Sequence, residues 1–132
     1  MITTKGKYTL LIMIDLAENT DGDIISLNEI AKHQGISKKY LETIVKKLVK
    51  ADLIVGIGGC KGGYKLVKSP KKYTVGEIIE ASGEDLSTVA CLDSSKFRCA
   101  KAKSCKTLAV WKGLNKTIHD YLYSIKLSDL IK

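Results

Sequence analysis

Two helix-start signals on either side of a single glycine constrain the fold of this chain more than any other sequence feature. Ser26 and Glu29 form a capping box, in which the serine hydroxyl accepts a free backbone N–H and the glutamate reaches back to the cap. A short helix is therefore predicted to end at Gly35, which supplies a turn with positive φ. Ser37 caps a further helix that runs to about Lys50. Two short helices joined by such a turn indicate a helix-turn-helix.

A glycine-rich segment follows these helices and is flanked by short apolar runs. Leu53–Val55 and Tyr64–Val67 are strand candidates, and residues 56–63 between them contain five glycines together with Cys60 and Lys61. Two strands around a flexible tip predict a β-hairpin, the wing of a winged helix-turn-helix. A glycine-rich loop can also hold the phosphates of a nucleotide. The P-loop opens a helix, however, whereas this segment opens a strand, so we expect no nucleotide site here.

Helical periodicity accounts for two further predicted elements. An N-terminal amphipathic helix is expected over residues 4–18, with its apolar stripe at Tyr8, Leu11, Ile12 and Leu16. A second capping box, Thr74 with Glu77, predicts another helix that ends near Gly83.

A long helix is predicted from about Cys105 to Ile125. Its apolar residues alternate three and four positions apart: Trp111, Leu114, Ile118, Tyr121 and Ile125. Core packing within one chain would explain this seam, but so small a domain offers little other core for the helix to cover. We therefore favour a two-fold homodimer formed through the seam.

The expected fold class is mainly α with a small β-hairpin wing. The length of 132 residues fits one domain, or one small domain with an appendage. We expect a winged helix-turn-helix over residues 1–83, a cysteine-bearing segment over 84–104, and a dimerisation helix with its tail over 105–132.

Positive charge is concentrated in one part of the chain. The net charge is +8, and residues 32–72 contain eleven Lys against Glu42 and Asp52, a local balance of +9. The remainder of the chain therefore balances to −1. Such a concentration is typical of a surface that binds a polyanion such as DNA, although lysines on an ordinary solvated surface are the alternative.

Several function classes are not expected. The longest apolar run, Leu10–Ile14, has five residues, and no signal-peptide pattern is present, so we expect a cytoplasmic protein without a membrane partner. The two histidines, His33 and His119, lie in separate predicted helices and form no evident Cys–His arrangement. We therefore expect neither an enzyme nor a protein with a small-molecule substrate.

Three cysteines form the most reactive group in the sequence. Cys91, Cys99 and Cys105 are spaced C-x7-C-x5-C among five cationic residues, Lys96, Arg98, Lys101, Lys103 and Lys106. Cations favour the thiolate, which binds metals and reacts with oxidants. In a reducing compartment structural disulfides are not expected, and the paired ligands of a zinc site are missing. A metal or redox site and scattered buried thiols both remain open on spacing alone.

Four features in this order carry a wider resemblance: Thr4–Tyr8, Ile36–Glu42, Gly62–Leu66, and three late cysteines before a Trp-bearing helix. Together they resemble the IscR/NsrR/CymR family of bacterial winged-helix transcription regulators over nearly the whole chain. The resemblance implies a homodimer that binds a palindromic operator in double-stranded DNA. It also implies an iron–sulfur cluster whose state sets DNA affinity or operator choice.

By position, Cys91, Cys99 and Cys105 match the cluster ligands of that family, although the first gap is longer here. A [2Fe-2S] cluster is favoured over [4Fe-4S]. In some relatives the fourth ligand is a histidine, and in others it is a carboxylate from the first helix. The matching positions in this chain are Leu108 and Lys7, respectively, and neither side chain can bind iron. The remaining candidates are His33 from the partner subunit, Asp15, Cys60, or an exogenous small ligand or water.

The resemblance also places the DNA contacts. They are expected at the start of the second helix of the helix-turn-helix and on the wing: Ser37, Lys38, Lys39, Tyr40, Glu42, Lys61 and Lys65. Glu42 matches a position that influences sequence preference in the family, and its alternative role is a helix pair with Lys46. Gly58 stands where many relatives have an arginine for the minor groove.

Two other functions stay open at this point. One is a cluster-free member of the family, regulated by thiol oxidation or by a partner protein, for example in cysteine or sulfur metabolism. The other is an interaction module that no longer reads DNA, against which the +9 segment argues.

Overall fold

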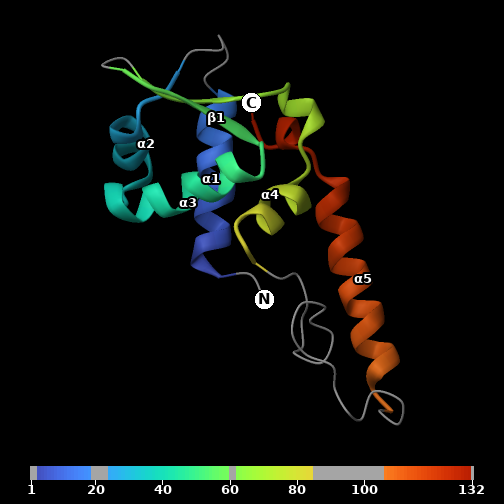
Figure 1. Cartoon of the computed structure of the whole chain (residues 1–132). Coiled ribbons are helices and arrows are strands. Elements are labelled where there is room, and N and C mark those ends of the chain that lie inside the picture. Colours follow the sequence, from blue (N-terminus) through green and yellow to red (C-terminus); the bar gives the residue numbers. More distant parts are fainter. Residues whose placement is uncertain (1–2, 19–23, 60–61, 85–105, 132) are drawn as a thin grey trace.

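The computed structural model describes residues 3–18, 24–59, 62–84 and 106–131 and consists mainly of helices with a two-stranded antiparallel sheet (Figure 1). The elements in chain order are α1 (Thr4–Glu18), α2 (Leu27–Gln34), α3 (Lys38–Lys50), β1 (Ile54–Ile57), β2 (Gly63–Leu66), η1 (Pro70–Lys72), α4 (Val75–Ala81), α5 (Leu108–Ser124) and η3 (Leu127–Asp129). The predicted class, mainly α with a β-hairpin wing, is confirmed.

The helix-turn-helix forms as its capping signals predict. The Glu29 N–H donates to Ser26 Oγ at 3.2 Å, and the Tyr40 N–H donates to Ser37 Oγ at 3.1 Å. Gly35 between the two helices has φ 65°, in the left-handed region that glycine adopts without strain. These caps define where α2 and α3 begin and therefore how the start of α3 is presented.

The main core lies between α1, α3 and α4. On α3 four apolar residues at helical spacing are fully buried: Leu41, Ile44, Val45 and Leu48. On α1 the buried residues are Gly6, Thr9, Ile12, Met13, Leu16 and Ala17. The predicted stripe of α1 is wrong at Leu11, which is 43% exposed because it lies beside this face rather than on it.

The wing is longer than predicted. Its strands pair from Ile54 with Leu66 to Ile57 with Gly63, so the ladder continues into the segment expected to be a flexible tip. Backbone groups make this ladder, and the Tyr64 ring covers Gly56, where an added Cβ would lie 3.1 Å from Tyr64 Cε1. The main-chain N–H of Tyr64 also donates to the Ile25 carbonyl at 2.9 Å. The wing is thereby joined to the segment before α2.

The last helix, α5, contacts the rest of the protein at its C-terminal end (Figure 1). There Leu122, Tyr123 and Ile125 pack against Val75 and Ile79 of α4, and beyond the helix Leu127 is fully buried in the main core. The helix begins at Leu108 and ends at Ser124, within the predicted limits of 105–125. Among the described residues, no helix combines the length and the apolar character needed to cross a membrane.

The close contact between α4 and α5 predicts a stability effect at Gly76. A Cβ at this position would lie 2.2 Å from Cδ2 of Tyr123, so Gly76→Ala is expected to displace α5 and cost about 1–3 kcal/mol of unfolding free energy. Gly58→Ala is the control, because its Cβ would meet no atom within 4 Å. Equal urea denaturation midpoints for the two variants would contradict this account of the α4–α5 contact.

Candidate nucleic-acid interface

The start of α2, the first half of α3 and the wing lie on the side of the molecule away from α5 (Figure 1). Between them lies an open hollow of about 540 Å³. It is lined by Ser26, Leu27, Asn28, Lys38, Glu42, Gly56, Ile57, Gly58, Gly59, Gly62, Gly63 and Tyr64. Two of the predicted DNA contacts, Lys38 and Glu42, are thus brought to the same concave surface as the wing.

The N-terminal end of α3 is suited to bind an anion. Ser37, Lys38 and Lys39 are all exposed there. The first N–H groups of a helix have no partner within the helix, and the helix dipole places partial positive charge at this end. Serine, two lysines and these N–H groups together offer hydrogen-bond donors and positive charge to a phosphate or to the edge of a base.

Tyr40 contributes to packing as well as to the surface. It is half-buried, and its ring meets that of Tyr8 edge-on, with 6.0 Å between ring centroids and 85° between planes. Such aromatic pairs stabilise the contact between the elements that carry them. Tyr40 therefore joins the start of α3 to α1, a role that the sequence pattern did not indicate.

Glu42 lies on the wall of the hollow and is half-buried. In the described part of the chain no ion pair joins it to Lys46, the partner expected in the alternative interpretation. Its carboxylate can therefore accept a hydrogen bond from a molecule that enters the hollow.

The wing presents both lysine and apolar side chains. Lys65 on β2 is half-buried and pairs across the hairpin with Val55, while Val55, Ile57 and Val67 are exposed. Lys61 lies outside the described residues. A Cβ added at Gly58 would meet no atom within 4 Å.

Three residues of the hollow with polar side chains were missed by sequence reasoning: Ser26, Asn28 and Tyr64. The capping box that begins α2 could have indicated the first two, because it places polar side chains at a second helix N-terminus. Nothing in the strand pattern indicated Tyr64, whose position depends on pairing across the hairpin.

The predicted cluster ligands lie outside the described residues, whereas two of the candidate fourth ligands lie within them. Cys91, Cys99, Cys105 and Cys60 lie outside the described residues, and within the described ranges no group of three or more potential metal ligands is present. His33 on α2, a candidate fourth ligand, bonds through Nδ1 to the carboxylate of Asp15 on α1 at 3.0 Å. Gln34 donates to the same carboxylate at 3.4 Å. Two of the candidate ligands are thus paired with each other across α1 and α2.

The predicted dimer seam lies mostly on the exposed side of α5. Leu114 is 42% exposed and Tyr121 is 64% exposed, while Trp111 and Ile118 are half-buried. Val110, which the sequence reasoning did not include, is 60% exposed and lies about one helical turn before Leu114, so it widens this surface. Ile125 differs from the others, because it packs against α4 of its own chain. We call Val110, Trp111, Leu114, Ile118 and Tyr121 the outer face of α5.

Comparison with known proteins agrees with this geometry. The family described as Rrf2, iron-dependent transcriptional regulator, matches residues 2–132. The HTH-type transcriptional regulator IscR of Vibrio campbellii is 34% identical over 131 residues, which cover 99% of this chain and 77% of that protein. The structure of CymR, the global cysteine regulator of B. subtilis, is 35% identical with a TM-score of 0.79 and covers 98% of this chain and 95% of its own. An oxidized form of Staphylococcus aureus CymR is 31% identical with a TM-score of 0.75, over 100% of this chain and 96% of its own.

Proposed function

The chain belongs to the Rrf2 family of DNA-binding transcriptional regulators, and from that membership we propose that it binds a palindromic operator as a homodimer. Members of this family are regulators rather than enzymes. The observation that carries the proposal is the exposed basic start of α3 beside the wing, with the hollow between them. A recognition helix and a wing so arranged can occupy adjacent grooves of one duplex.

Each side chain of this surface has a distinct part in DNA binding. Ser37 and the N-terminus of α3 bind a backbone phosphate, while Lys38 or Lys39 reaches O6 and N7 of a guanine in the major groove. Glu42 accepts a hydrogen bond from cytosine N4 and repels phosphate, so it discriminates between sequences more than it attracts DNA. Lys61 and Lys65 of the wing neutralise backbone phosphates. Tyr40 holds the start of α3 against Tyr8.

The outer face of α5 forms the dimer contact in this proposal. The five apolar residues of the outer face are costly to leave in water. In a two-fold dimer, the outer face of one chain packs against the outer face of the other and removes both from water. The two recognition helices then meet half-sites about one turn of DNA apart. The domain limits follow from these roles: DNA binding by residues 1–83, sensing by 84–104, and dimerisation by 105–132.

The assigned role of Glu42 predicts a change in sequence preference. Glu42→Ala is expected to reduce discrimination against a substituted operator base pair about tenfold, because a good pair contributes about 1–3 kcal/mol of discrimination. Affinity for random DNA is expected to rise, since a carboxylate near the phosphates is removed. Fluorescence anisotropy with operator and single-substitution duplexes measures both quantities.

Glu18→Ala, at the exposed end of α1, is the matched control for this experiment. It removes the same charge from a residue that does not line the hollow and should leave discrimination unchanged. An unaltered preference in Glu42→Ala would contradict a base contact at this position.

Cys91, Cys99 and Cys105 supply a donor set that fits an iron–sulfur cluster, because three thiolates in a cationic segment match the ligands such clusters prefer. A bound cluster, with [2Fe-2S] favoured, would add a centre that responds to redox state, nitric oxide or cluster supply. His33 of the partner subunit stays a candidate fourth ligand through its other ring nitrogen, since Nδ1 is held by Asp15.

A described contact supports coupling between the cysteine segment and DNA binding. Lys47 near the end of α3 donates through Nζ to the carbonyl of Ser82 at 3.2 Å, and Ser82 caps α4 shortly before the cysteine segment begins. A structural change in the cysteine segment can therefore move α3, the recognition helix, through the contact between Ser82 and Lys47.

Cys99→Ala tests both parts of the sensing proposal. Anaerobically purified wild type is expected to be brown and to contain iron and acid-labile sulfide, whereas the variant should have much less of both. The variant should also bind the operator equally well under reduced and oxidised conditions. A colourless wild type with stoichiometric zinc would contradict the cluster, and operator binding like wild type in both conditions would contradict the coupling.

A second candidate is a cluster-free regulator that responds to thiol oxidation or to a partner protein. The similarity to CymR, one form of which was crystallised oxidized, favours it. Both forms of this candidate predict a colourless protein. If thiol oxidation is the signal, its operator affinity changes on oxidation and no longer changes in Cys99→Ala. The anaerobic absorption spectrum therefore separates the two candidates.

A further inference from the structure

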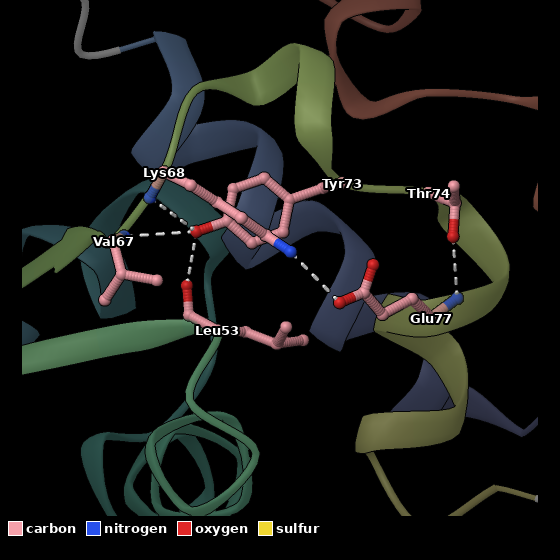
Figure 2. Close-up of polar contacts among 6 residues, drawn as sticks. All are labelled: Leu53, Val67, Lys68, Tyr73, Thr74 and Glu77. Atoms are coloured by element: carbon pink, nitrogen blue, oxygen red, sulfur yellow. Dashed lines mark hydrogen bonds and ion pairs between the residues drawn. The ribbon is translucent and has the colours of Figure 1, made fainter.

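Tyr73 joins both strands of the wing at their base (Figure 2). It is the largest of the fully buried side chains among the described residues. Its hydroxyl donates to the carbonyl of Leu53 at 2.6 Å and accepts the N–H groups of Val67 at 3.1 Å and Lys68 at 3.3 Å. Leu53 directly precedes β1, and Val67 and Lys68 directly follow β2. One oxygen atom thus closes the open end of the hairpin.

The main chain around Tyr73 is bonded to the segment that directly follows α5. The Leu127 N–H donates to the Tyr73 carbonyl at 3.0 Å, and the Val75 N–H donates to the Ile125 carbonyl at 2.9 Å. Between them Thr74 forms an isolated β-bridge with Lys126. Residues 73–75 therefore lie between the base of the wing and the end of the helix proposed to form the dimer.

The side chain of Lys68 lies over one face of the Tyr73 ring. Its Nζ lies 4.8 Å from the ring centroid and 3.4 Å from the carboxylate of Glu77, whose own N–H donates to Thr74 Oγ1 at 3.2 Å (Figure 2). Because burial raises the pKa of Tyr73 above its usual value, the hydroxyl remains a donor at neutral pH. The three bonds to the wing are therefore all available under physiological conditions.

We infer that Tyr73 is a positioning residue that couples the wing to α5, so that the orientation of the wing on DNA follows the dimer helix. Two of the four cross-strand pairs of the wing contain a glycine, Gly56 or Gly63, and glycine supplies no side chain for packing. Loss of the hydroxyl would leave three main-chain groups without their partner, and such groups are costly to leave unpaired. The inference rests on the proposed operator binding.

Tyr73→Phe removes the hydroxyl alone and tests the inference. Operator affinity is expected to fall about tenfold, which corresponds to the net free energy of about one hydrogen bond between the wing and DNA. Hydroxyl-radical footprinting should show reduced protection beneath the wing and unchanged protection beneath α3. Tyr123→Phe is the matched control, because it removes a phenol hydroxyl that bonds Glu80 between α5 and α4 without touching the wing.

A double-mutant cycle with Lys65→Ala separates positioning from general loosening of the fold. If Tyr73 acts through the wing, the double variant loses less binding free energy than the sum of the losses in the two single variants. The reason is that each substitution removes the same wing–DNA interactions. Fully additive reductions, or weaker protection beneath α3 and the wing alike, would overturn the inference. So would operator affinity of Tyr73→Phe equal to wild type.

Hydrogen exchange of the wild-type protein gives a test that does not depend on any variant folding. Binding of operator DNA should slow exchange of the Val67 and Lys68 amides and, through Tyr73, that of the Leu127 amide. Slowing at the wing with no change at Leu127 would contradict the coupling. A wild type that prefers no DNA sequence would instead contradict the proposed function, so the two failures are distinguishable.

Discussion

Operator affinity is expected to fall about 100-fold when Lys38 and Lys39 are both replaced by alanine, because base and phosphate contacts of this kind contribute about 1–3 kcal/mol each. Both side chains are exposed at the N-terminus of α3, where the helix itself also attracts anions. The slope of log affinity against log salt should decrease in magnitude by about 0.9 for each phosphate that the variant no longer neutralises. Fluorescence anisotropy at several salt concentrations measures both effects.

The control for this experiment is the paired replacement of Lys112 and Lys116 on α5. Both are exposed, and helical spacing places them on the opposite side of that helix from its outer face. Their removal changes the net charge by the same amount and should alter operator affinity only slightly. Equal reductions in the two double variants would mean that net charge, rather than contact by α3, governs binding.

Leu114→Asp is expected to convert the dimer to a monomer and to lower operator affinity more than about 100-fold, since each half-site is then bound separately. A two-fold contact would bury the new carboxylate twice, and a buried charge without a partner is strongly unfavourable. Analytical ultracentrifugation gives the mass in solution, and anisotropy gives the affinity. Stability of the single chain should change little, because Leu114 is 42% exposed there.

Ala109→Asp introduces the same carboxylate on the opposite side of α5, at another exposed position. It should remain dimeric and bind the operator like wild type. A dimeric Leu114→Asp protein would contradict the outer face of α5 as the dimer contact and would place that contact elsewhere on the chain.

Local signals predicted the helices of the DNA-binding half closely. Ser26, Ser37 and Thr74 each act as the expected cap, because an N-cap depends on residues only two or three positions away. The sequence predicted the buried face of α1 less well, because apolar residues lie on more than one side of that helix. Packing against the other helices determines which of them are buried. Leu11 is exposed for this reason.

Contacts between distant parts of the chain were not predictable in the same way. The role of Tyr73 depends on the carbonyl of Leu53, twenty positions earlier, and on main-chain groups that carry no sequence signal. The strands extend into Gly56 and Gly63 because their pairing uses backbone groups, whereas the prediction used side-chain patterns. Ile125 follows the spacing of the seam but packs on α4. Helical spacing alone does not show whether such a residue contacts its own chain or a partner.

Selection from a library of random DNA duplexes tests the central claim, sequence-specific operator binding by α3 and the wing, most directly. Enriched duplexes should contain a palindrome with half-sites about one helical turn apart. Their affinity should exceed that of shuffled duplexes by at least about 1,000-fold and decrease with salt. No enrichment, with equal affinity for enriched and shuffled duplexes at every salt concentration, would contradict the account.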